Sequence, residues 1–367
     1  MQKKRNFLLK ILLFPVYLGY RFVVFWRNFF YDTGVFKSKE FQIPIISIGN
    51  ILVGGTGKTP HTEMIVEFLK DDYNIAVLSR GYKRKSKGFL EVNVNSSFAQ
   101  VGDEPLQTKR KFPEIIVAVC RNRAKGIEQL MCSYPDLNAI ILDDAFQHRR
   151  VKPGISMLLN NFNIPLSNTQ LLPYGYLREQ RSAVHRADLI FVTKCPENMK
   201  LIERRIMLKE MDPRPYQTLF FSTYEYFEPK PVFESMAKKF PIDDNSLKII
   251  AVSGIAYSNN FIKYLKTKSN TVIHLRFKDH HNFKKKDILK LETTYHNMSG
   301  NIVILTTEKD SVRLQENLYI SDELKSVMYY IPIKVKMMGG KDDVLQLKSI
   351  FSSYVTTNKR YNKLYRS

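Results

Sequence analysis

The sequence has few cysteines, few acidic residues and no long uninterrupted apolar run, and each shortage excludes a class of protein. Its three cysteines, Cys120, Cys132 and Cys195, form no CxxC pair, which excludes a disulfide framework and a cysteine-based zinc site and suits a reducing cytosol. Glycine and proline number only 16 each in 367 residues, which excludes collagen-like and low-complexity architectures. Asp and Glu number 35 against 57 Lys and Arg, so the net charge is +22. That excess predicts an anionic partner: nucleic acid, a phosphorylated substrate or an acidic membrane face.

The first 35 residues are rich in basic, aromatic and aliphatic side chains. The longest stretch without a charge, 11–20, contains Pro15 and is shorter than the roughly 20 residues that span a bilayer. No small-residue cleavage site of a secretory signal follows, and basic residues interrupt the apolar run. We therefore expect an amphipathic helix that lies in a membrane interface, with aromatic and aliphatic residues on one side and basic residues on the other. A helix packed on the protein's own core is the alternative.

Short β-branched runs alternate with helical patterns along most of the chain. Runs that are apolar on both faces predict the strands of a parallel sheet that helices cover on both sides. A charged helix over 195–211 and an alternating strand over 216–229 come after them. The first six predicted strands are 43–48, 75–80, 115–120, 139–144, 155–160 and 187–194.

A second α/β unit begins at 247 with the same alternation and ends in an alternating strand over 327–337. The strands 216–229 and 327–337 bracket this unit, and we expect them to pair as a two-stranded hinge. Such a hinge lets the last helix return to the first domain. The length of 367 residues also predicts about two domains.

The glycine-rich motif GGTGKT, 54–59, lies between the first predicted strand and a predicted helix, which is the context that a phosphate-binding loop needs. Glycines let backbone N–H groups turn toward phosphate oxygens, Lys58 reaches the β- and γ-phosphates, and the Thr59 hydroxyl binds Mg²⁺. Leu52 stands where the general pattern has a glycine, and a glycine-rich turn without a ligand is the alternative. The predicted phosphate-binding residues are Leu52, Val53, Gly54, Gly55, Thr56, Gly57, Lys58 and Thr59.

The dipeptide Asp143-Asp144 ends the predicted strand 139–144. An acidic residue at the carboxyl end of a strand beside a phosphate loop can hold Mg²⁺, although such residues also cap helices. Together with the phosphate loop, this pair predicts a site for ATP or GTP and either phosphoryl transfer or hydrolysis.

Three more polar clusters lie where this topology places strand ends: 102–105 (GDEP), 147–150 (QHRR) and 279–281 (DHH). Ligands of open α/β sheets bind outside the carboxyl ends of the strands. A carboxylate that accepts a hydroxyl proton and a histidine that orients it are what a kinase base requires. The alternatives are a helix cap at 103–104, zinc ligation at 279–281 and a solvated basic face at 149–150.

Nine segments between residues 47 and 314, which include the motifs described above, together resemble the tetraacyldisaccharide 4′-kinase family of lipid A biosynthesis. Their order and spacing over most of the chain carry the resemblance, and GDEP, DDAFQH and DHH in sequence are more specific than the phosphate loop alone. The family commonly has glycine where Ala145 stands and a small residue or proline where Tyr176 stands, and neither position carries a reacting group. The segments are SIGNILVGGTGKTP (47–60), LSRGYKRK (78–85), VGDEP (101–105), RNRAKGIEQL (121–130), ILDDAFQHRR (141–150), LLPYGYLREQRSAVHRAD (171–188), SGIAYSNNF (253–261), FKDHHNF (277–283) and TTEKDSVRL (306–314).

The pattern of strands and motifs predicts an α/β fold: a P-loop NTPase-like parallel sheet domain and a second, smaller α/β domain joined by a strand hinge. We expect an amphipathic membrane-associated segment (1–35) and a nucleotide-binding domain (36–215). A second domain with the hinge strands (216–338) and a C-terminal helix with a basic tail (339–367) complete the chain.

The resemblance implies Mg²⁺-dependent transfer of the γ-phosphate of ATP to the 4′-hydroxyl of a tetraacylated glucosamine disaccharide 1-phosphate, which forms lipid IVA. The implied location is peripheral, on the cytoplasmic face of the inner membrane of a Gram-negative bacterium. No nucleic-acid ligand and no obligate protein partner are inferred.

The resemblance also implies roles for single residues. Thr59 and Asp143 hold Mg²⁺, with Glu104 as a further ligand. Asp103 is the expected base for the sugar hydroxyl, with His280 of the second domain as its partner, so catalysis depends on domain closure. Because phosphoryl transfer relies mainly on positioning and charge neutralisation, we expect the loss of Lys58 to cost more activity than the loss of a histidine. Further substrate or phosphate contacts are expected from Arg80, Arg121, Asp144, Gln147, His148, Arg178 and Glu179.

Two other functions stay open on the sequence. A nucleic-acid-dependent P-loop ATPase suits the positive charge, but the basic residues do not interleave with an RNA-binding signature and no helicase motif follows the acidic pair. A membrane adaptor that uses nucleotide as a switch is the other alternative. Turnover stimulated only by the acylated disaccharide excludes the first, and net phosphate transfer excludes the second.

Overall fold

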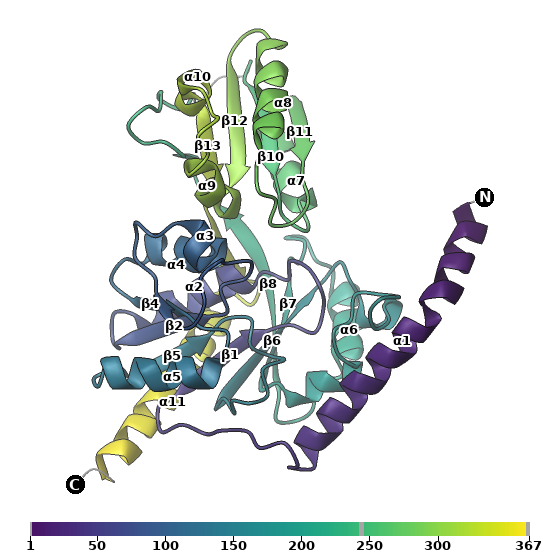
Figure 1. Ribbon diagram of the computed structural model, residues 1–367, viewed down its shortest axis with the longest axis vertical. Helices are drawn as coiled ribbons and strands as arrows, with labels where there is room; N and C mark the ends of the chain where they lie inside the picture. Colours follow the sequence, from purple (N-terminus) through teal and green to yellow (C-terminus); the bar gives the residue numbers. More distant parts are fainter. Residues whose placement is uncertain (1, 242–245, 365–367) are drawn as a thin grey trace.

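The computed structural model describes residues 2–241 and 246–364, and within these residues the strands form a nine-stranded and a five-stranded sheet. In Figure 1 the smaller sheet lies above the larger one, and α1 (Gln2–Asp32) projects from the side of the larger unit. Helices accompany both sheets. The α/β fold class predicted from the strand pattern is therefore confirmed.

The larger sheet has a parallel centre with an antiparallel strand at each edge. Its strand order is β14-β8-β7-β6-β1-β5-β2-β4-β3, and the edge pairs β14–β8 and β4–β3 are antiparallel. All six strands predicted for the first domain are present, with small shifts at their ends. The strands are β1 (Ile45–Gly49), β2 (Ile75–Ser79), β3 (Leu90–Glu91), β4 (Ile116–Val119), β5 (Ala139–Leu142), β6 (Ile155–Asn161), β7 (Leu189–Thr193), β8 (Thr218–Tyr226) and β14 (Ile333–Met337).

Helices cover both faces of this sheet, which is why its strands are apolar on both sides. Ile46 of β1 packs into a cluster with residues of α2 (Lys58–Leu69), α4 (Asp103–Lys111) and α11 (Lys341–Leu364), whereas Ile45 packs with α5 (Arg123–Ser133) on the opposite face. Phe351 of α11 is fully buried in the first cluster, so the last helix returns to the first domain as predicted. The remaining helices of this unit are α3 (Phe98–Val101), α6 (Leu201–Met211) and the short 3₁₀ helices η1 (Leu166–Asn168) and η2 (Arg181–Arg186).

The smaller sheet is parallel except for one edge strand. Its order is β11-β10-β12-β13-β9, and β9 runs antiparallel to β13. Ile250 and Ile249 of β10 point into separate apolar clusters, so this sheet is also covered on both faces. Its strands are β9 (Lys230–Pro231), β10 (Lys248–Ser253), β11 (Thr271–Arg276), β12 (Ile302–Thr307) and β13 (Met328–Ile331), and its helices are α7 (Asn259–Lys268), α8 (Lys285–His296), α9 (Glu308–Gln315) and α10 (Asp322–Ser326).

The single strand predicted over 327–337 is wrong, because this segment forms two strands, β13 and β14, in different sheets. Pro332 separates them, since proline has no N–H to donate to a sheet. β13 pairs with β12, whereas β14 pairs antiparallel with β8, with Ile333 opposite Tyr226. The two strands that bracket the second unit thus pair as predicted, and β8 is also hydrogen-bonded to β7 of the larger sheet.

Helix α1 contacts the body through one side and exposes the other. Tyr17 stacks on Tyr174 with ring centroids 4.5 Å apart, and the Tyr20 hydroxyl donates to the Arg178 carbonyl at 2.8 Å. Arg27 also turns inward and donates to the Gln147 carbonyl. The solvent-facing side carries large apolar side chains: Ile11, Leu12, Phe14, Val16, Leu18, Phe22, Val23, Phe25, Trp26 and Phe29.

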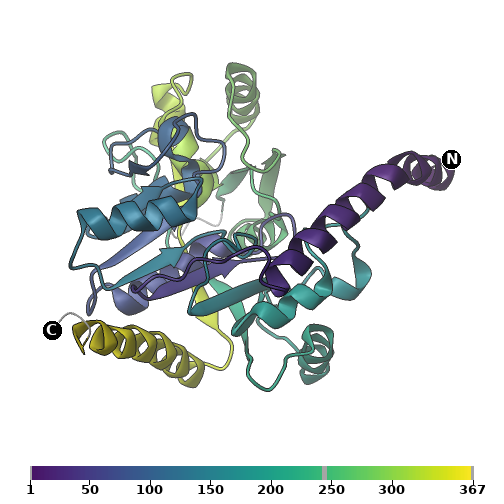
Figure 2. The same ribbon diagram turned by 60° about the horizontal axis from the view of Figure 1, so that its bottom comes forward.

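The first turns of α1 extend beyond the rest of the molecule in both views (Figures 1 and 2). Among the described residues, no helix combines the length and the apolar character that crossing a bilayer requires.

Candidate active site

The loop at 50–57, between β1 and α2, is held in shape by hydrogen bonds. Asn50 Nδ2 donates to Thr56 Oγ1 at 2.7 Å, and Thr193 Oγ1 at the end of β7 donates to the Thr56 carbonyl at 2.8 Å. Gly57 has a φ of 89°, and a Cβ at this position would lie 2.1 Å from the Tyr224 hydroxyl, so only glycine fits. Lys58 then begins α2, at the place where a phosphate-binding loop needs its lysine.

The predicted phosphate-binding residues divide into two groups. The Leu52 side chain is fully buried and does not line the cavity beside the loop, whereas residues 53–59 do. The Val53 N–H already donates to the Tyr176 carbonyl at 2.7 Å. The loop residues placed to meet a phosphate are therefore 54–59.

Asp143, at the end of β5, is buried beside the start of α2. Its carboxylate accepts hydrogen bonds from the Thr62 and Ser79 hydroxyls, each at 3.3 Å. Burial and the charges of Glu104 and Asp144 raise the pKa of Asp143 to about 7. The carboxylates of Asp143, Asp144 and Glu104 thus lie close enough to repel one another, and a cation bound among them would reduce this repulsion.

The second acidic residue, Asp144, pairs with two cations. Its Oδ1 lies 3.5 Å from Lys58 Nζ and 3.4 Å from Arg178 Nη1. Burial alone raises the pKa of Asp144, but Lys58 and Arg178 outweigh it, so the pKa lies below its usual value. Asp144 therefore ties the P-loop lysine to the segment around Arg178.

Arg123 is a buried residue of the site that the sequence reasoning missed. Its Nη2 donates to the Asp143 carbonyl and its Nη1 to the Cys120 carbonyl, each at 3.0 Å, so it fixes the end of β5 against the end of β4. The sequence reasoning selected Arg121 from the same segment, but the structure leaves Arg121 exposed and buries Arg123. The only signal for Arg123 was its place within the RNRAKG segment.

Asp103 and His280 meet across the two domains. Asp103 Oδ2 lies 2.9 Å from His280 Nδ1, although the two residues are 177 positions apart in the chain. Asp103 also begins α4, where its Oδ1 accepts the Glu104 N–H at 3.0 Å, so it serves the helix start as well as the histidine. The Tyr82 ring covers the histidine, with centroids 4.9 Å apart.

Lys309, at the start of α9, completes this cluster. Its Nζ lies 3.1 Å from His280 Nε2 and 2.8 Å from Glu104 Oε1. A lysine can only donate, so His280 Nε2 accepts and the ring N–H lies on Nδ1, directed at Asp103. Burial raises the pKa of Asp103, but the His280 hydrogen bond and Lys309 outweigh it and hold the pKa far below its usual value.

Two of the basic residues predicted to contact substrate follow strands of the larger sheet, and one of them, Arg80, acts on His148. Arg80 is exposed just after β2, and Arg121 is exposed just after β4. His148 is half-buried, and its Nε2 is a buried nitrogen without a hydrogen-bond partner in the part of the chain that the structure describes. Burial, together with Arg123 and Arg150, lowers the pKa of His148 to about 4. The arginines around this neutral histidine can attract an anionic group, and its unpaired Nε2 can form a hydrogen bond with a ligand.

Two other predicted contact residues, Gln147 and Glu179, make hydrogen bonds and an ion pair within the protein. Gln147 Nε2 donates to the Asn50 carbonyl at 2.6 Å, at the start of the phosphate loop. Glu179 is buried, accepts from Asn28 of α1 at 3.1 Å and pairs with Arg186 at 2.8 Å. These contacts tie α1 to the loops that surround the site.

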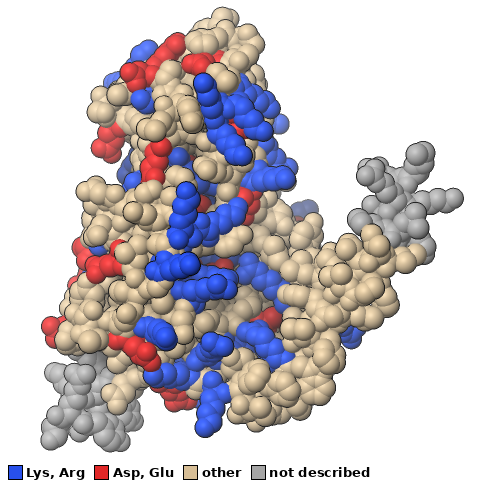
Figure 3. All heavy atoms as spheres, viewed as in Figure 1, with Lys and Arg blue, Asp and Glu red and all other residues tan. Residues whose placement is uncertain are grey.

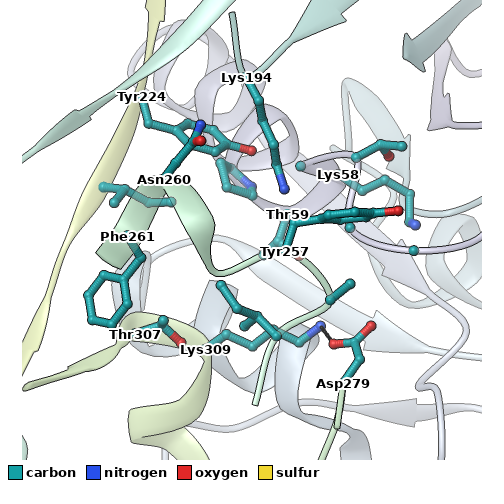
Figure 4. A pocket seen from close by; sticks show the side chains of 18 of the residues that line it. Lys58, Thr59, Lys194, Tyr224, Tyr257, Asn260, Phe261, Asp279, Thr307 and Lys309 are labelled. Atoms are coloured by element: carbon teal, nitrogen blue, oxygen red, sulfur yellow. Dashed lines mark ion pairs between the residues drawn. The ribbon is translucent and has the colours of Figure 1, made fainter. Parts of the chain in front are cut away.

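A cavity of about 520 Å³ lies between the phosphate loop and the second domain. Figure 4 shows Lys58, Lys194 and Lys309 directed into it from three different elements, with Tyr257 between them. Asp279 lies 3.9 Å from Lys309. Lys194, Tyr257 and Lys309 are not among the site residues predicted from the sequence. Lys309 does lie in one of the segments that carry the family resemblance, TTEKDSVRL (306–314).

Within residues 2–241 and 246–364, no group of three or more His, Cys, Asp and Glu side chains is arranged to hold a metal ion by itself. The predicted ligands Asp143 and Glu104 supply two carboxylates, and Thr59 supplies a hydroxyl. In the DHH segment, His281 pairs with Asp287 at 2.9 Å, an arrangement that serves the second domain's own packing.

A lysine that opens a helix after a glycine loop, with an acidic residue at the end of the adjacent strand, places this chain among the P-loop nucleotide-binding proteins. The cross-domain Asp–His pair adds a group able to take a proton from a hydroxyl or from water.

Comparison with known proteins narrows this class to one family. The family model described as tetraacyldisaccharide-1-P 4′-kinase matches residues 9–350. The tetraacyldisaccharide 4′-kinase of Phocaeicola vulgatus is 42% identical over 95% of this chain and 96% of its own length. That of Bacteroides thetaiotaomicron is 40% identical over 95% of this chain and 94% of its own. A crystal structure of LpxK from Aquifex aeolicus in complex with ATP is 27% identical, with a TM-score of 0.69 over 95% of this chain and 99% of that one.

The chain belongs to the tetraacyldisaccharide 4′-kinase family. It phosphorylates the 4′-position of tetraacyldisaccharide 1-phosphate and so forms lipid IVA. The family and the activity that the motifs predicted are thus confirmed.

Proposed function

We propose that this chain takes the phosphoryl group from ATP with the help of Mg²⁺, and that Asp103 and His280 together receive the proton of the 4′-hydroxyl. The observation that carries the proposal is the 2.9 Å contact between Asp103 Oδ2 and His280 Nδ1. It sets a carboxylate and a histidine from two domains beside the cavity that the phosphate loop lines.

ATP is the proposed donor because the loop offers the backbone N–H groups and the lysine that a polyphosphate needs, and because the Aquifex aeolicus relative holds ATP. Lys58 Nζ lies 3.5 Å from Asp144 Oδ1. We expect its ammonium group to exchange this carboxylate for phosphate oxygens, which leaves Asp144 paired with Arg178.

The donor set near Asp143 fits Mg²⁺, which prefers oxygen ligands. The Thr59 hydroxyl and the Asp143 carboxylate are the proposed ligands, and Glu104 can join them by leaving Lys309. When bound, the cation neutralises charge on the β- and γ-phosphates. The raised pKa of Asp143 fits this assignment, since its cause is burial next to other carboxylates.

Asp103 is suited to accept a proton because it remains ionised at neutral pH. His280 and Lys309 hold it in one orientation through a continuous chain of hydrogen bonds. Proton transfer in such a reaction comes late, as the phosphoryl group reaches the hydroxyl oxygen, so positioning matters more than the strength of the base. Because the pair spans two domains, the base is complete only while they are in contact.

The acceptor is an anionic lipid, and we propose that it lies between the basic loops and α1. Arg80, Arg121, His148 and Arg178 are the proposed contacts for its phosphate and sugar groups. Figure 3 shows Lys and Arg side chains gathered on the face that Figure 1 also presents, which suits an anionic ligand.

We also propose that the exposed apolar side of α1 lies in the membrane interface on the cytoplasmic face of the inner membrane. Phe22 and Val23 are 64% and 61% exposed, which is costly in water and favourable in the interface. Contacts through Tyr17, Tyr20 and Asn28 join this helix to the segment at 171–180, so a lipid acceptor can pass from the membrane to the site along protein surface.

The test is incubation of the full-length chain with γ-labelled ATP, Mg²⁺ and tetraacyldisaccharide 1-phosphate, with separation of the lipid product by thin-layer chromatography. We expect label in the lipid, its loss with excess chelator, and its loss in Lys58→Ala. Label released only as inorganic phosphate in the presence of lipid would contradict the proposal.

A further inference from the structure

Lys194 is one of the three lysines, with Lys58 and Lys309, that line the cavity. It follows β7 directly and has a φ of 60°, a left-handed backbone conformation that residues other than glycine rarely adopt. Its Nζ lies 3.6 Å from the position that a Cβ on Gly55 would occupy. The amine of Lys194 thus lies beside Gly55 of the phosphate loop, and Figure 4 shows this side chain directed into the cavity.

The partner of this amine is an aromatic ring from the second domain. Lys194 Nζ lies 5.3 Å from the centroid of Tyr257. The same ring covers Gly54, since its Cε2 lies 3.2 Å from where a Cβ on that glycine would stand. Tyr257 and Lys194 therefore border the cavity directly beside the loop that a nucleotide's phosphates would contact.

The three lysines of the cavity differ in whether a carboxylate lies close enough to form an ion pair with them. Lys58 has Asp144 within 3.5 Å, and Lys309 has Glu104 within 2.8 Å. For Lys194, the described residues provide no carboxylate within ion-pair distance; Asp279 acts on it only at longer range. Burial, together with Lys309 and Lys58, lowers the pKa of Lys194 to about 8. An anion bound beside Lys194 would neutralise its positive charge.

We propose that Lys194 is a second phosphate-binding lysine of the nucleotide site, whose ammonium group binds the β- and γ-phosphates beside Lys58. Lys58 comes from α2 and Lys194 from the end of β7, so the two cations reach the phosphates from different elements. Tyr257 holds the Lys194 amine in place until the nucleotide arrives. This inference rests on the proposed use of ATP as donor.

A purely structural role is the competing explanation, in which Lys194 only joins the two domains through the Tyr257 ring. The two explanations differ in which ligand they affect. Loss of a phosphate contact weakens binding of ATP and leaves AMP unaffected, because AMP has neither a β- nor a γ-phosphate. Loss of a domain contact changes the thermal stability and weakens both nucleotides together.

The experiment uses full-length protein and measures the affinities for ATP and AMP by calorimetric titration, with AMP also measured by displacement. The variants are Lys194→Met, which keeps the aliphatic stem, Lys194→Arg, which keeps the charge, and Lys209→Met on the exposed side of α6 as control. We expect Lys194→Met to weaken ATP by about 10- to 100-fold, the range for loss of a hydrogen bond between charged groups. AMP affinity stays within about threefold, Lys194→Arg recovers most of the ATP affinity, and Lys209→Met resembles the wild type.

ATP affinity in Lys194→Met within about twofold of the wild type overturns the inference, and so does an equal loss of ATP and AMP affinity. If Lys194→Met does not fold, Lys194→Gln takes its place with the same two criteria. A wild-type chain that does not bind ATP refutes the proposed function itself, whereas normal ATP binding by both wild type and variant refutes only the role of Lys194.

Discussion

Replacement of Asp103 by asparagine tests the cross-domain pair most directly. Asp103 Oδ1 accepts the Glu104 N–H, and Oδ2 accepts the His280 Nδ1–H. Asparagine keeps one acceptor but directs an NH₂ group at the histidine N–H. The ring cannot adapt by moving its proton to Nε2, because Lys309 donates to that nitrogen at 3.1 Å. Turned the other way, its oxygen accepts the histidine N–H but its NH₂ group faces the Glu104 N–H, so either orientation loses one of the two hydrogen bonds that Asp103 accepts.

The size of the effect follows from what is lost. Removal of a general base typically lowers a rate by about 10²- to 10⁴-fold, which is about 3–5 kcal/mol on the barrier. Asp103 makes no contact with the phosphate loop, so we expect ATP affinity to change by less than about threefold. His280→Ala removes the other member of the pair and should lower kcat comparably. Residues that act as one unit are non-additive, so the double variant should be no more than about tenfold worse than the poorer single one.

The assay is kcat at saturating ATP and saturating lipid, measured as transfer of label to the lipid. Asp287→Asn is the matched control, since Asp287 and His281 form a second pair at the same 2.9 Å distance, away from the cavity. Its kcat should stay within about twofold of the wild type. Near wild-type kcat in Asp103→Asn, or fully multiplicative losses in the double variant, would refute the pair as a catalytic unit.

Three further predictions concern the loop, the membrane and the domain interface. Lys58→Ala should lower kcat at least ~10³-fold with a normal melting temperature, because it removes the charge next to the transferring group; the phosphate-transfer assay checks this. Phe22→Glu with Val23→Glu should reduce sedimentation with anionic vesicles, whereas Tyr319→Glu, at an exposed site of the second domain, should not. Glu63 of α2 pairs with Lys111 at 2.6 Å, and Lys111 also pairs with Glu308 of α9 at 3.3 Å. Burial outweighs Lys111 and raises the pKa of Glu63 to about 7, so the stability that its protonation gives is complete below about pH 4 and is lost as the pH rises through 7. The free energy of unfolding of Glu63→Gln minus that of the wild type should therefore increase from pH 5 to pH 8, by up to about 3 kcal/mol. Urea titrations of both proteins at the two pH values measure this difference, and a decrease over the interval would contradict the assignment.

Local sequence was enough to predict the elements whose geometry is set by neighbouring residues. The phosphate loop is of this kind, since a β-branched strand, GGTGKT and a helix follow one another in the chain. The Asp143 position follows in the same way from an apolar strand that ends in acid. The Asp103–His280 contact could be expected only through the family resemblance, because no local pattern joins residues 177 positions apart.

The residues that sequence reasoning missed or placed differently depend on distant partners. Glu179 stands among polar residues in the sequence, but Asn28 and Arg186 enclose it in the fold. Arg123 and Arg121 are two positions apart and equally basic, and the direction in which each leaves the end of β4 decides which is buried. Lys194 has no sequence signal, because its role depends on an unusual φ and on a ring from the other domain.

The crossing of the chain between the two sheets has a consequence for the order in which the protein forms during synthesis. Every strand of the smaller sheet lies between 230 and 331, so it leaves the ribosome as one contiguous piece. The larger sheet lacks its edge strand β14 and its covering helix α11 until residues 333–364 have been synthesised. Until then, the apolar surface that Leu347, Phe351 and Val355 cover stays open to water. A chain that stops after β14 carries every residue of the active site, yet we expect it to fail through aggregation and not through lost chemistry.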